Sequence, residues 1–253
     1  MNFLPICLLA SSLLLGEGVG HQKGGANRNP PSKIEVILFR VNVGEAFNPF
    51  IENAYLVVDA HTRNAILIDP GSPDDRIDDY LSQHRLKLRA ILNTHGHLDH
   101  TGGNEYYARR YKVQAYAHRL DRPMILTNAA MMSFVSKMGR TRLGGFDMRL
   151  LHIPGHTPGS VVYIIQGSLF SGDTLFQRSI GMAWGTTEVE KARCLQQEID
   201  SIRTKLFPLP SDTLVYPGHG DRTTLGAERE NNPWLNPGTT QPLAAPGTAS
   251  GGR

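Results

Sequence analysis

The sequence predicts a globular domain of the α/β or α+β class. Its 253 residues, with 40% hydrophobic content, are enough to enclose a large core. Short aliphatic runs, which are typical of strands, alternate with stretches of helical periodicity, and Gly- or Pro-rich turns separate them. Hairpins and helical crossovers occur in two halves of the chain. This mixture fits two sheets packed face to face with helices outside.

The expected elements follow one another along the chain, each strand being a short apolar run bounded by turn residues. Strands are predicted at Ile34–Val41, Asn53–Asp59, Ala65–Asp69, Arg89–Thr94, Val113–Ala117, Met148–Ile153, Ser160–Gln166, Ser168–Ser171 and Thr213–Tyr216. Helices are predicted at Asp74–His84, at Gly103–Tyr111, inside Leu120–Met138 and at Glu188–Leu206. In the last of these, apolar residues from Val189 to Leu206 recur at helical spacing.

The two ends of the chain differ from this central part. Residues 1–20 carry an apolar run that suits a secretory signal, with small residues permitting cleavage before His21. A secretory signal usually has a Lys or Arg before its apolar run, and this run has none. A cytoplasmic location is therefore the alternative to export. Residues 21–33 are interpreted as a flexible leader and residues 236–253 as a disordered tail. One domain, residues 34–235, is left between them.

Composition and charge exclude several partners. The net charge is +3, and no basic run or basic patch interleaved with aromatic residues occurs, so nucleic acid is not indicated. The N-terminal apolar run is too short for a stable membrane anchor. Only Cys194 would remain after cleavage, which excludes an internal disulfide. The oligomeric state is left open.

The most informative segment is Thr94–Gly103, which follows a predicted buried strand and contains His95, His97, Asp99 and His100. Imidazole and carboxylate together are ligands for Zn, Fe or Mn rather than for Mg or Ca. A single loop therefore carries most of the ligands for two adjacent cations.

Three further segments each place one metal-competent side chain beside Gly or Pro at the end of an apolar run. They are Pro154–Ser160 with His156, Ser171–Leu175 with Asp173, and Tyr216–Gly220 with His219. Glycine allows the backbone to approach an ion closely, and proline stiffens the turn. Four such segments in order along one domain predict one shared site.

At these residues the chain resembles the metallo-β-lactamase superfamily, whose pattern is HxHxDH followed by a His, a bridging Asp and a final His. The resemblance covers roughly residues 34–235 and implies a four-layer αβ/βα sandwich. Within the superfamily the chain looks most similar to the small glyoxalase II-like hydrolases. The segments that carry this closer resemblance are His156–Ser160, Gly172–Phe176 and Gly218–Gly226.

The resemblance implies a role for each ligand. It assigns His95, His97 and His156 to a first divalent ion, and Asp99, His100 and His219 to a second. Asp173 would bridge the two ions, which are expected to be Zn, with Fe or Mn as alternatives. The two catalytic residues would be Asp99, which orients a metal-bridging hydroxide, and Asp173, which holds the ions about 3.5–4 Å apart.

The function that the resemblance implies is hydrolysis of a small acyl substrate, with the thioester of a thiol carrier as the leading candidate. Lactone or ester hydrolysis is an alternative. β-Lactam cleavage is disfavoured, because lactamases of this superfamily generally lack a bridging carboxylate where Asp173 stands. A mononuclear-iron persulfide dioxygenase would use only His95, His156 and Asp173. A non-catalytic metal-binding domain would normally have lost ligands, and the nuclease branch needs a further domain.

The chain departs from the family pattern in two places. Relatives usually have an Arg and an Asp after the bridging Asp, whereas this chain has the apolar segment Gly181–Gly185, which contains Met182 and Trp184. Glyoxalase II also carries a C-terminal helical domain that grips glutathione, and this chain ends soon after Trp234. Both departures argue against the usual glutathione thioester.

Other residues receive a structural interpretation. His118 and His152 are expected to be structural, and His21, His61 and His84 to lie on the surface. Asp69 has two equal interpretations, as a partner of a metal-bound histidine or as a turn cap. The Met-rich segment Leu120–Phe146 is interpreted either as a helix packed on the core or as a lid over the cleft, facing Trp184.

Overall fold

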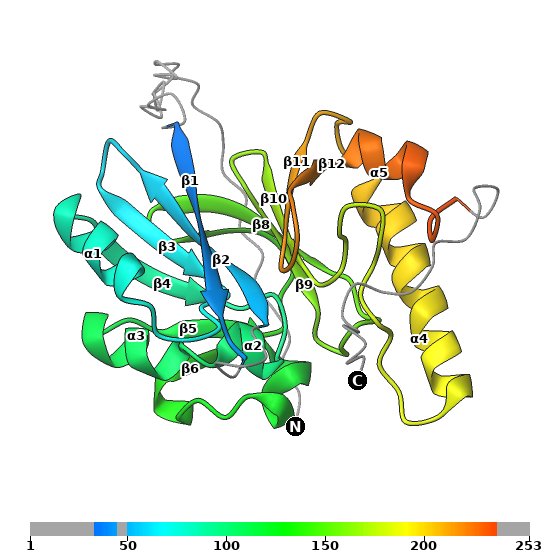
Figure 1. The fold of residues 1–253 in the computed structure, drawn as a ribbon, viewed down its shortest axis with the longest axis horizontal. Coiled ribbons are helices and arrows are strands. Elements are labelled where there is room, and N and C mark those ends of the chain that lie inside the picture. Colours follow the sequence, from blue (N-terminus) through cyan, green and yellow to red (C-terminus); the bar gives the residue numbers. More distant parts are fainter. Residues whose placement is uncertain (1–32, 45–49, 237–253) are drawn as a thin grey trace, which may run out of the picture. The chain divides into compact units, whose positions relative to one another are not determined.

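Two sheets form the centre of the fold in the computed structural model of the chain, which describes residues 33–44 and 50–236 (Figure 1). Several predicted segments lie outside these residues: the signal (1–20), nearly all of the leader (21–33) with His21, and nearly all of the tail (236–253). The boundaries predicted for these segments therefore stay predictions.

The first sheet comes from the N-terminal half, with the strand order β1-β2-β3-β4-β5-β6. Its strands are β1 (Ile34–Asn42), β2 (Ile51–Asp59), β3 (Asn64–Ile68), β4 (Lys87–Leu92), β5 (Ala115–His118) and β6 (Met132–Val135). β1, β2 and β3 pair antiparallel, whereas β3 to β6 run parallel. The parallel pairs need crossover connections, and the helices between these strands supply them.

The second sheet comes from the C-terminal half, with the order β12-β11-β10-β9-β8-β7. Its strands are β7 (Gly139–Leu143), β8 (Phe146–His152), β9 (Val161–Ile165), β10 (Ser168–Gly172), β11 (Leu214–Pro217) and β12 (Thr223–Thr224). Only β10 and β11 pair in parallel. Their connection contains the long helix α4 (Glu188–Ser201) and the π-helical turn η3 (Ile202–Leu206).

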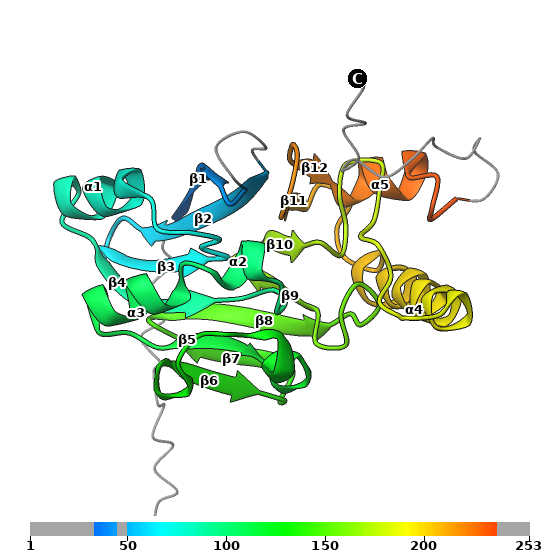
Figure 2. The same ribbon diagram turned by 60° about the horizontal axis from the view of Figure 1, so that its bottom comes forward.

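Successive apolar side chains of a strand point to opposite faces of its sheet. In β3, Ile66 and Ile68 pack with the second sheet, whereas Ala65 and Leu67 pack toward helices α1 (Asp75–Gln83) and α3 (Asn104–Tyr111). This period of two buries both faces of the sheet. A third cluster joins the second sheet to η3 and to α5 (Leu225–Asn231). The result is four layers, helix, sheet, sheet and helix (Figure 2).

Local sequence explains where the longer helices begin. Asp74 accepts a hydrogen bond from the Arg76 N–H at the start of α1. At the start of α4, Thr187 and Glu190 form a reciprocal capping box. In the described part of the chain, none of the helices combines the length and the apolar composition needed to span a bilayer.

The structure corrects the prediction for Leu120–Met138. The segment contains two short 3₁₀ helices, η1 (Arg119–Met124) and η2 (Ala129–Met131), followed by β6, rather than an α-helix. Pro123 lies inside η1 and does not favour a longer helix. The alternation of Met132, Ser133 and Phe134 fits β6, which pairs in parallel with β5.

The lid interpretation of this segment does not fit two of its methionines, Met131 and Met132. Met132 is buried in the helix-facing core of the first sheet, and Met131 and Phe134 pack against that core. Val135 and Met138 pack against the cluster between the two sheets. The interpretation as part of the core therefore holds, although its secondary structure is not helical.

Candidate metal centre

The predicted ligand segments converge because they follow strand ends at one edge of the two sheets. The loop after β4 carries His95 and His97, and the short helix α2 (Leu98–Thr101) carries Asp99 and His100. Asp173 directly follows β10, and His219 follows β11, its parallel neighbour. The carboxyl ends of parallel strands meet at one edge of a sheet, so residues distant in sequence become neighbours.

Three imidazoles form the first donor set, which we define as His95, His97 and His156. Their facing nitrogens lie 2.9 Å (His95–His97), 3.0 Å (His97–His156) and 3.2 Å (His95–His156) apart. A tetrahedral zinc ion with Zn–N bonds of about 2.0–2.1 Å separates its ligand atoms by about 3.3 Å. The triangle therefore has nearly the size that such an ion requires.

The second donor set, Asp99, His100 and His219, lies beside the first. Asp99 Oδ2 is 3.4 Å from His219 Nε2 and 3.7 Å from His100 Nε2. These three residues also lie with Glu52 in one group whose potential ligand atoms are all within 4.8 Å of one another.

Asp173 lies between the two donor sets. Its carboxylate is 3.3 Å from His100 Nε2 and 3.6 Å from His219 Nε2, and also 3.5 Å from His156 Nε2 in the first set. A Cβ atom at Gly218 would lie 2.3 Å from Asp173 Oδ1, so only glycine fits there. The structure thus brings all seven predicted ligands into one cluster.

Backbone carbonyls set the tautomers of two of these histidines. His156 donates its Nδ1–H to the Met182 carbonyl at 2.8 Å, and His219 donates its Nδ1–H to the Ile51 carbonyl at 2.7 Å. When such a ring is neutral, its Nε2 carries a lone pair that faces the cluster. Hydrogen bonds of this kind commonly orient metal-bound histidines.

The first set is electrostatically suited to neutral imidazole ligands. Burial, together with the facing imidazole of His156, lowers the pKa of His97 to about 4. Burial and the neighbouring histidines hold the pKa of His95 well below its ordinary value. Both rings therefore stay neutral at pH 7 and offer their lone pairs to a cation.

The second set is rich in negative charge. Burial opposes protonation of His100, but the surrounding carboxylates, Glu52 first among them, raise its pKa well above the ordinary value. Burial alone would raise the pKa of Asp173, yet the charge of His100 holds it well below the usual range. Several buried polar atoms here lack a hydrogen-bond partner: His100 Nδ1 and Nε2, Asp173 Oδ1 and His219 Nε2. Such atoms favour a bound cation.

Asp69 contacts both Thr94 and one of the predicted ligands, His100. Its carboxylate accepts hydrogen bonds from the Thr94 N–H at 2.8 Å and from the Thr94 hydroxyl at 2.6 Å. Its Oδ2 atom also lies 3.1 Å from His100 Nδ1. Of the two interpretations of Asp69, the contact with a predicted ligand histidine is therefore the one that the geometry supports.

Asp121, which sequence reasoning missed, ties two ligand loops together. This buried carboxylate accepts hydrogen bonds from the Gly96 N–H at 2.9 Å, the Gly159 N–H at 2.6 Å and the Thr157 hydroxyl at 2.7 Å. Gly96 lies between His95 and His97, and Thr157 follows His156. Asp121 therefore aligns the two loops that make up the first donor set.

Glu52 was also missed, although it lies within 3.2 Å of two predicted ligands. A signal was present, since a glutamate directly precedes the predicted strand Asn53–Asp59. A charged residue at the buried end of a strand needs a partner. Nothing in the sequence, however, shows which residue that partner is.

The remaining histidines agree with their structural interpretation. His118 and His152 stack on each other at 4.3 Å, and neither belongs to a potential metal-binding group in the described part of the chain. His61 and His84 are exposed. Burial lowers the pKa of His118 to about 4, which fits a neutral ring in a packed position.

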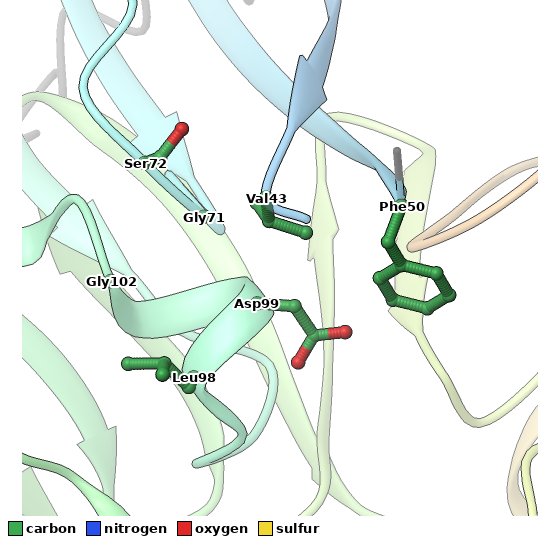
Figure 3. A pocket seen from close by; sticks show the side chains of 7 residues that line it. All are labelled: Val43, Phe50, Gly71, Ser72, Leu98, Asp99 and Gly102. Atoms are coloured by element: carbon green, nitrogen blue, oxygen red, sulfur yellow. The ribbon is translucent and has the colours of Figure 1, made fainter. Parts of the chain in front are cut away.

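Apolar side chains surround the cluster. Trp184 is partly exposed, 6.3 Å from the His97 ring, and Phe50 is partly exposed, 4.8 Å from the His219 ring. A pocket of about 610 Å³ lies beside the second donor set, lined by Val43, Phe50, Gly71, Ser72, Leu98, Asp99 and Gly102. Figure 3 shows the Asp99 carboxylate extending into the space that Val43 and Phe50 border.

Comparison with known proteins decides the family. The model of the metallo-beta-lactamase superfamily matches residues 47–219 of this chain. The chain belongs to this superfamily. Its predicted family and its four-layer fold are thereby confirmed.

Individual members of the superfamily cover most of the chain. Hydroxyacylglutathione hydrolase GloC of Haemophilus influenzae is 34% identical over 205 residues, which span 74% of this chain and 94% of GloC. The BLEG-1 B3 metallo-beta-lactamase structure has a TM-score of 0.65 at 30% identity, covering 80% of this chain and 100% of that one. The di-iron-bound form of TTHA1623 has a TM-score of 0.63 at 32% identity, covering 78% and 100%.

As a metallo-beta-lactamase superfamily protein, the chain is a metallo-hydrolase with His and Asp clusters that can hold metal ions. The similar proteins differ in the reaction that their names state, because one is named a hydroxyacylglutathione hydrolase and another a metallo-beta-lactamase. Family membership therefore leaves the substrate to be argued from the residues of this chain.

Proposed function

We propose that the protein is a dinuclear metal-dependent hydrolase that cleaves a thioester of a small acyl group. One observation carries the proposal: the Asp173 carboxylate lies within 3.6 Å of histidines from both donor sets. A carboxylate so placed suits a pair of adjacent ions, whereas a single ion would need only one set.

The residues fit two divalent cations. His95, His97 and His156 would hold one ion, Asp99, His100 and His219 the other, and Asp173 both. Imidazole nitrogens mixed with carboxylate oxygens suit Zn, with Fe or Mn as alternatives. When bound, such ions lower the pKa of water and polarise a carbonyl group.

Asp99 is the donor best placed to act on the substrate side. Its carboxylate is partly exposed and borders the pocket, unlike that of Asp173, which is buried. Asp99 can therefore accept a hydrogen bond from an attacking water and orient it toward the acyl carbon. Burial raises the pKa of Asp99, but the neighbouring His219 and the charge of His100 outweigh this effect and lower the pKa, which keeps the carboxylate ionised.

The thioester is favoured over the other acyl compounds by two observations together. The relative GloC is named as a hydrolase of a glutathione thioester, and 94% of its length aligns with this chain. The walls near the donor sets are apolar, with Trp184, Phe50 and Leu98 partly exposed. An apolar wall suits the acyl part of a thioester better than a small polar acid.

β-Lactam hydrolysis is the second candidate, because the BLEG-1 structure superposes over 80% of this chain at 30% identity. A mononuclear persulfide dioxygenase is less favoured. It would leave His97, Asp99, His100 and His219 unused, although all four face the same cluster. Lactone and ester hydrolysis share the same chemistry and remain to be separated by assay.

Metal analysis and a substrate panel test the proposal. We expect the protein purified without chelator to contain about two equivalents of Zn, Fe or Mn, since seven ligands exceed the capacity of one ion. Thioesters should be cleaved with a higher kcat/KM than lactones, esters or β-lactams, and chelation should abolish the activity. One equivalent or fewer, or a preference for β-lactams, would refute the proposed function.

The pocket beside Asp99 yields a prediction on substrate preference. Replacing Phe50 by alanine should reduce the preference for an octanoyl over an acetyl thioester about five- to tenfold, because about 1 kcal/mol of apolar contact is lost. The measurement is kcat/KM for both thioesters, together with metal content, since Phe50 also stacks on His219. Leu38→Ala is the control, because Leu38 is equally exposed (43%) but does not line this pocket. An unchanged preference in Phe50→Ala would place the acyl group elsewhere.

A further inference from the structure

Glu52 is a buried carboxylate outside the set of seven predicted ligands. It is the second residue of β2, its side chain is fully buried, and neither of its oxygens has a hydrogen-bond partner. An isolated buried carboxylate costs several kcal/mol unless a positive charge or a donor faces it. The surroundings of Glu52 must therefore supply that partner.

Both oxygens of Glu52 face histidines of the second donor set. Oε1 lies 3.1 Å from His100 Nδ1, and Oε2 lies 3.2 Å from His219 Nε2. Asp69 Oδ2 lies equally near His100 Nδ1, at 3.1 Å, and the Asp69 carboxylate also accepts two hydrogen bonds from Thr94. Two carboxylates therefore face His100 Nδ1, and Glu52 is the one that also faces His219.

The backbone on either side of Glu52 fixes this placement. The Ile51 carbonyl accepts the Nδ1–H of His219 at 2.7 Å. On the other side, the Asn53 N–H donates to the Gly218 carbonyl at 2.7 Å, and the Asn53 side chain donates to the Gly220 carbonyl at 2.8 Å. The start of β2 and the loop that carries His219 are therefore joined, and Glu52 cannot turn away from the cluster.

The contacts of His219 favour a positive charge at this place. Nδ1 of His219 donates to a carbonyl, so Nε2 is the nitrogen that faces the cluster. It lies near oxygens of Glu52 at 3.2 Å, Asp99 at 3.4 Å and Asp173 at 3.6 Å. Three carboxylates around one ring nitrogen favour a positive charge there, either a proton on Nε2 or a bound metal ion.

We propose that Glu52 is a positioning residue of the second metal ion. Resting on the proposed dinuclear function, this role has two parts. Oε1 accepts the Nδ1–H of His100 and so leaves the His100 Nε2 lone pair free to bind the ion. The carboxylate also adds a negative charge beside the second site and thereby strengthens binding of the second cation.

Stepwise metal titration tests this role without using activity. Metal-free wild-type protein and Glu52→Gln are titrated with Zn²⁺ by calorimetry and by competition with a chelating indicator. Glutamine keeps the size of the side chain but removes its charge. We expect the first equivalent to bind as in wild type and the second to bind about 10–100-fold more weakly, as for other outer partners of metal ligands. Equal affinity for the second equivalent in both proteins would overturn the proposal.

Two further variants separate charge from packing. Glu228→Gln removes another buried glutamate charge, in α5 and outside the cluster, and should bind both equivalents as wild type does. Glu52→Asp keeps the charge but shortens the side chain by one methylene. The affinity of this variant for the second equivalent of Zn²⁺ should therefore fall between those of wild type and Glu52→Gln. If Glu52→Gln does not fold without metal, Glu52→Asp carries the test. A Glu52→Asp variant with wild-type affinity for the second ion would then refute the positioning role.

The outcomes distinguish this proposal from the proposed function. A wild-type protein that binds fewer than two ions would refute both. Two tightly bound ions in Glu52→Gln, combined with thioester hydrolysis by wild type, would refute the role of Glu52 alone. A weakened second ion without thioester hydrolysis would keep the role of Glu52 and refute only the substrate.

Discussion

Asp173→Ala is expected to lose one of two bound metal equivalents and to reduce kcat/KM by more than the 10–100-fold that the loss of an outer metal partner typically costs. The carboxylate lies within 3.6 Å of histidines from both donor sets, and its removal leaves the facing nitrogens of His100, His156 and His219 without their shared counter-charge. The measurements are metal content after dialysis and kcat/KM for the preferred thioester.

The control for this variant is Asp147→Ala, because the Asp147 carboxylate is exposed and only approaches Arg142, at 3.9 Å. It should retain both metal equivalents and wild-type turnover. His152→Ala should also keep both ions, whatever it does to stability, since His152 lies outside the cluster. Near-normal turnover of Asp173→Ala with both ions bound would show that the proposed mechanism is wrong.

Asp121→Ala is expected to lower the free energy of unfolding of the metal-free protein by about 3–5 kcal/mol. The buried carboxylate accepts three hydrogen bonds, from Gly96, Thr157 and Gly159, and alanine removes the acceptor of all three. Burial raises the pKa of Asp121, and the hydrogen bonds from these donors only partly counteract this effect.

The same substitution should weaken the first metal site, because Asp121 aligns the loop of His95 and His97 with the loop of His156. Urea denaturation measures the loss of stability, and chelator competition measures the loss of affinity for the first ion. Asp212→Ala, at an exposed aspartate, is the control and should change neither quantity by a measurable amount. If Asp121→Ala unfolds at the wild-type urea concentration, the three hydrogen bonds do not hold the loops together.

Most strands and the longer helices could be predicted because their apolar residues repeat with a clear period. Predicted Ile34–Val41 became β1 (Ile34–Asn42), and predicted Asp74–His84 became α1 (Asp75–Gln83). The exceptions are three short strands without a predicted counterpart, β6, β7 and β12. β6, for example, forms because β5 offers it a parallel partner, and a four-residue strand has too few residues to show its own period.

Most of the seven clustered residues could be predicted because they stand beside glycine in a turn at the end of an apolar run, and Asp99 and His100 because they share the loop of His95 and His97. Glu52 and Asp121 have no such marking. Glu52 is a single charge before the predicted strand Asn53–Asp59, and Asp121 stands between Leu120 and Arg122 in a stretch that contains several arginines. Their importance comes only from the groups that face them.

The sequence alone determined the order of most strands and longer helices and the residues that offer metal-competent side chains, because periodicity and ligand chemistry are local properties of the chain. Its motifs carried the resemblance that implied the family and the four-layer fold. Tertiary structure decided which of these side chains lie together, since Asp173 meets both donor sets only where two sheet edges come together. It also decided which buried carboxylates support them. The burial of a carboxylate and the charges that face it depend on residues far apart in the chain. No local sequence pattern therefore predicts them.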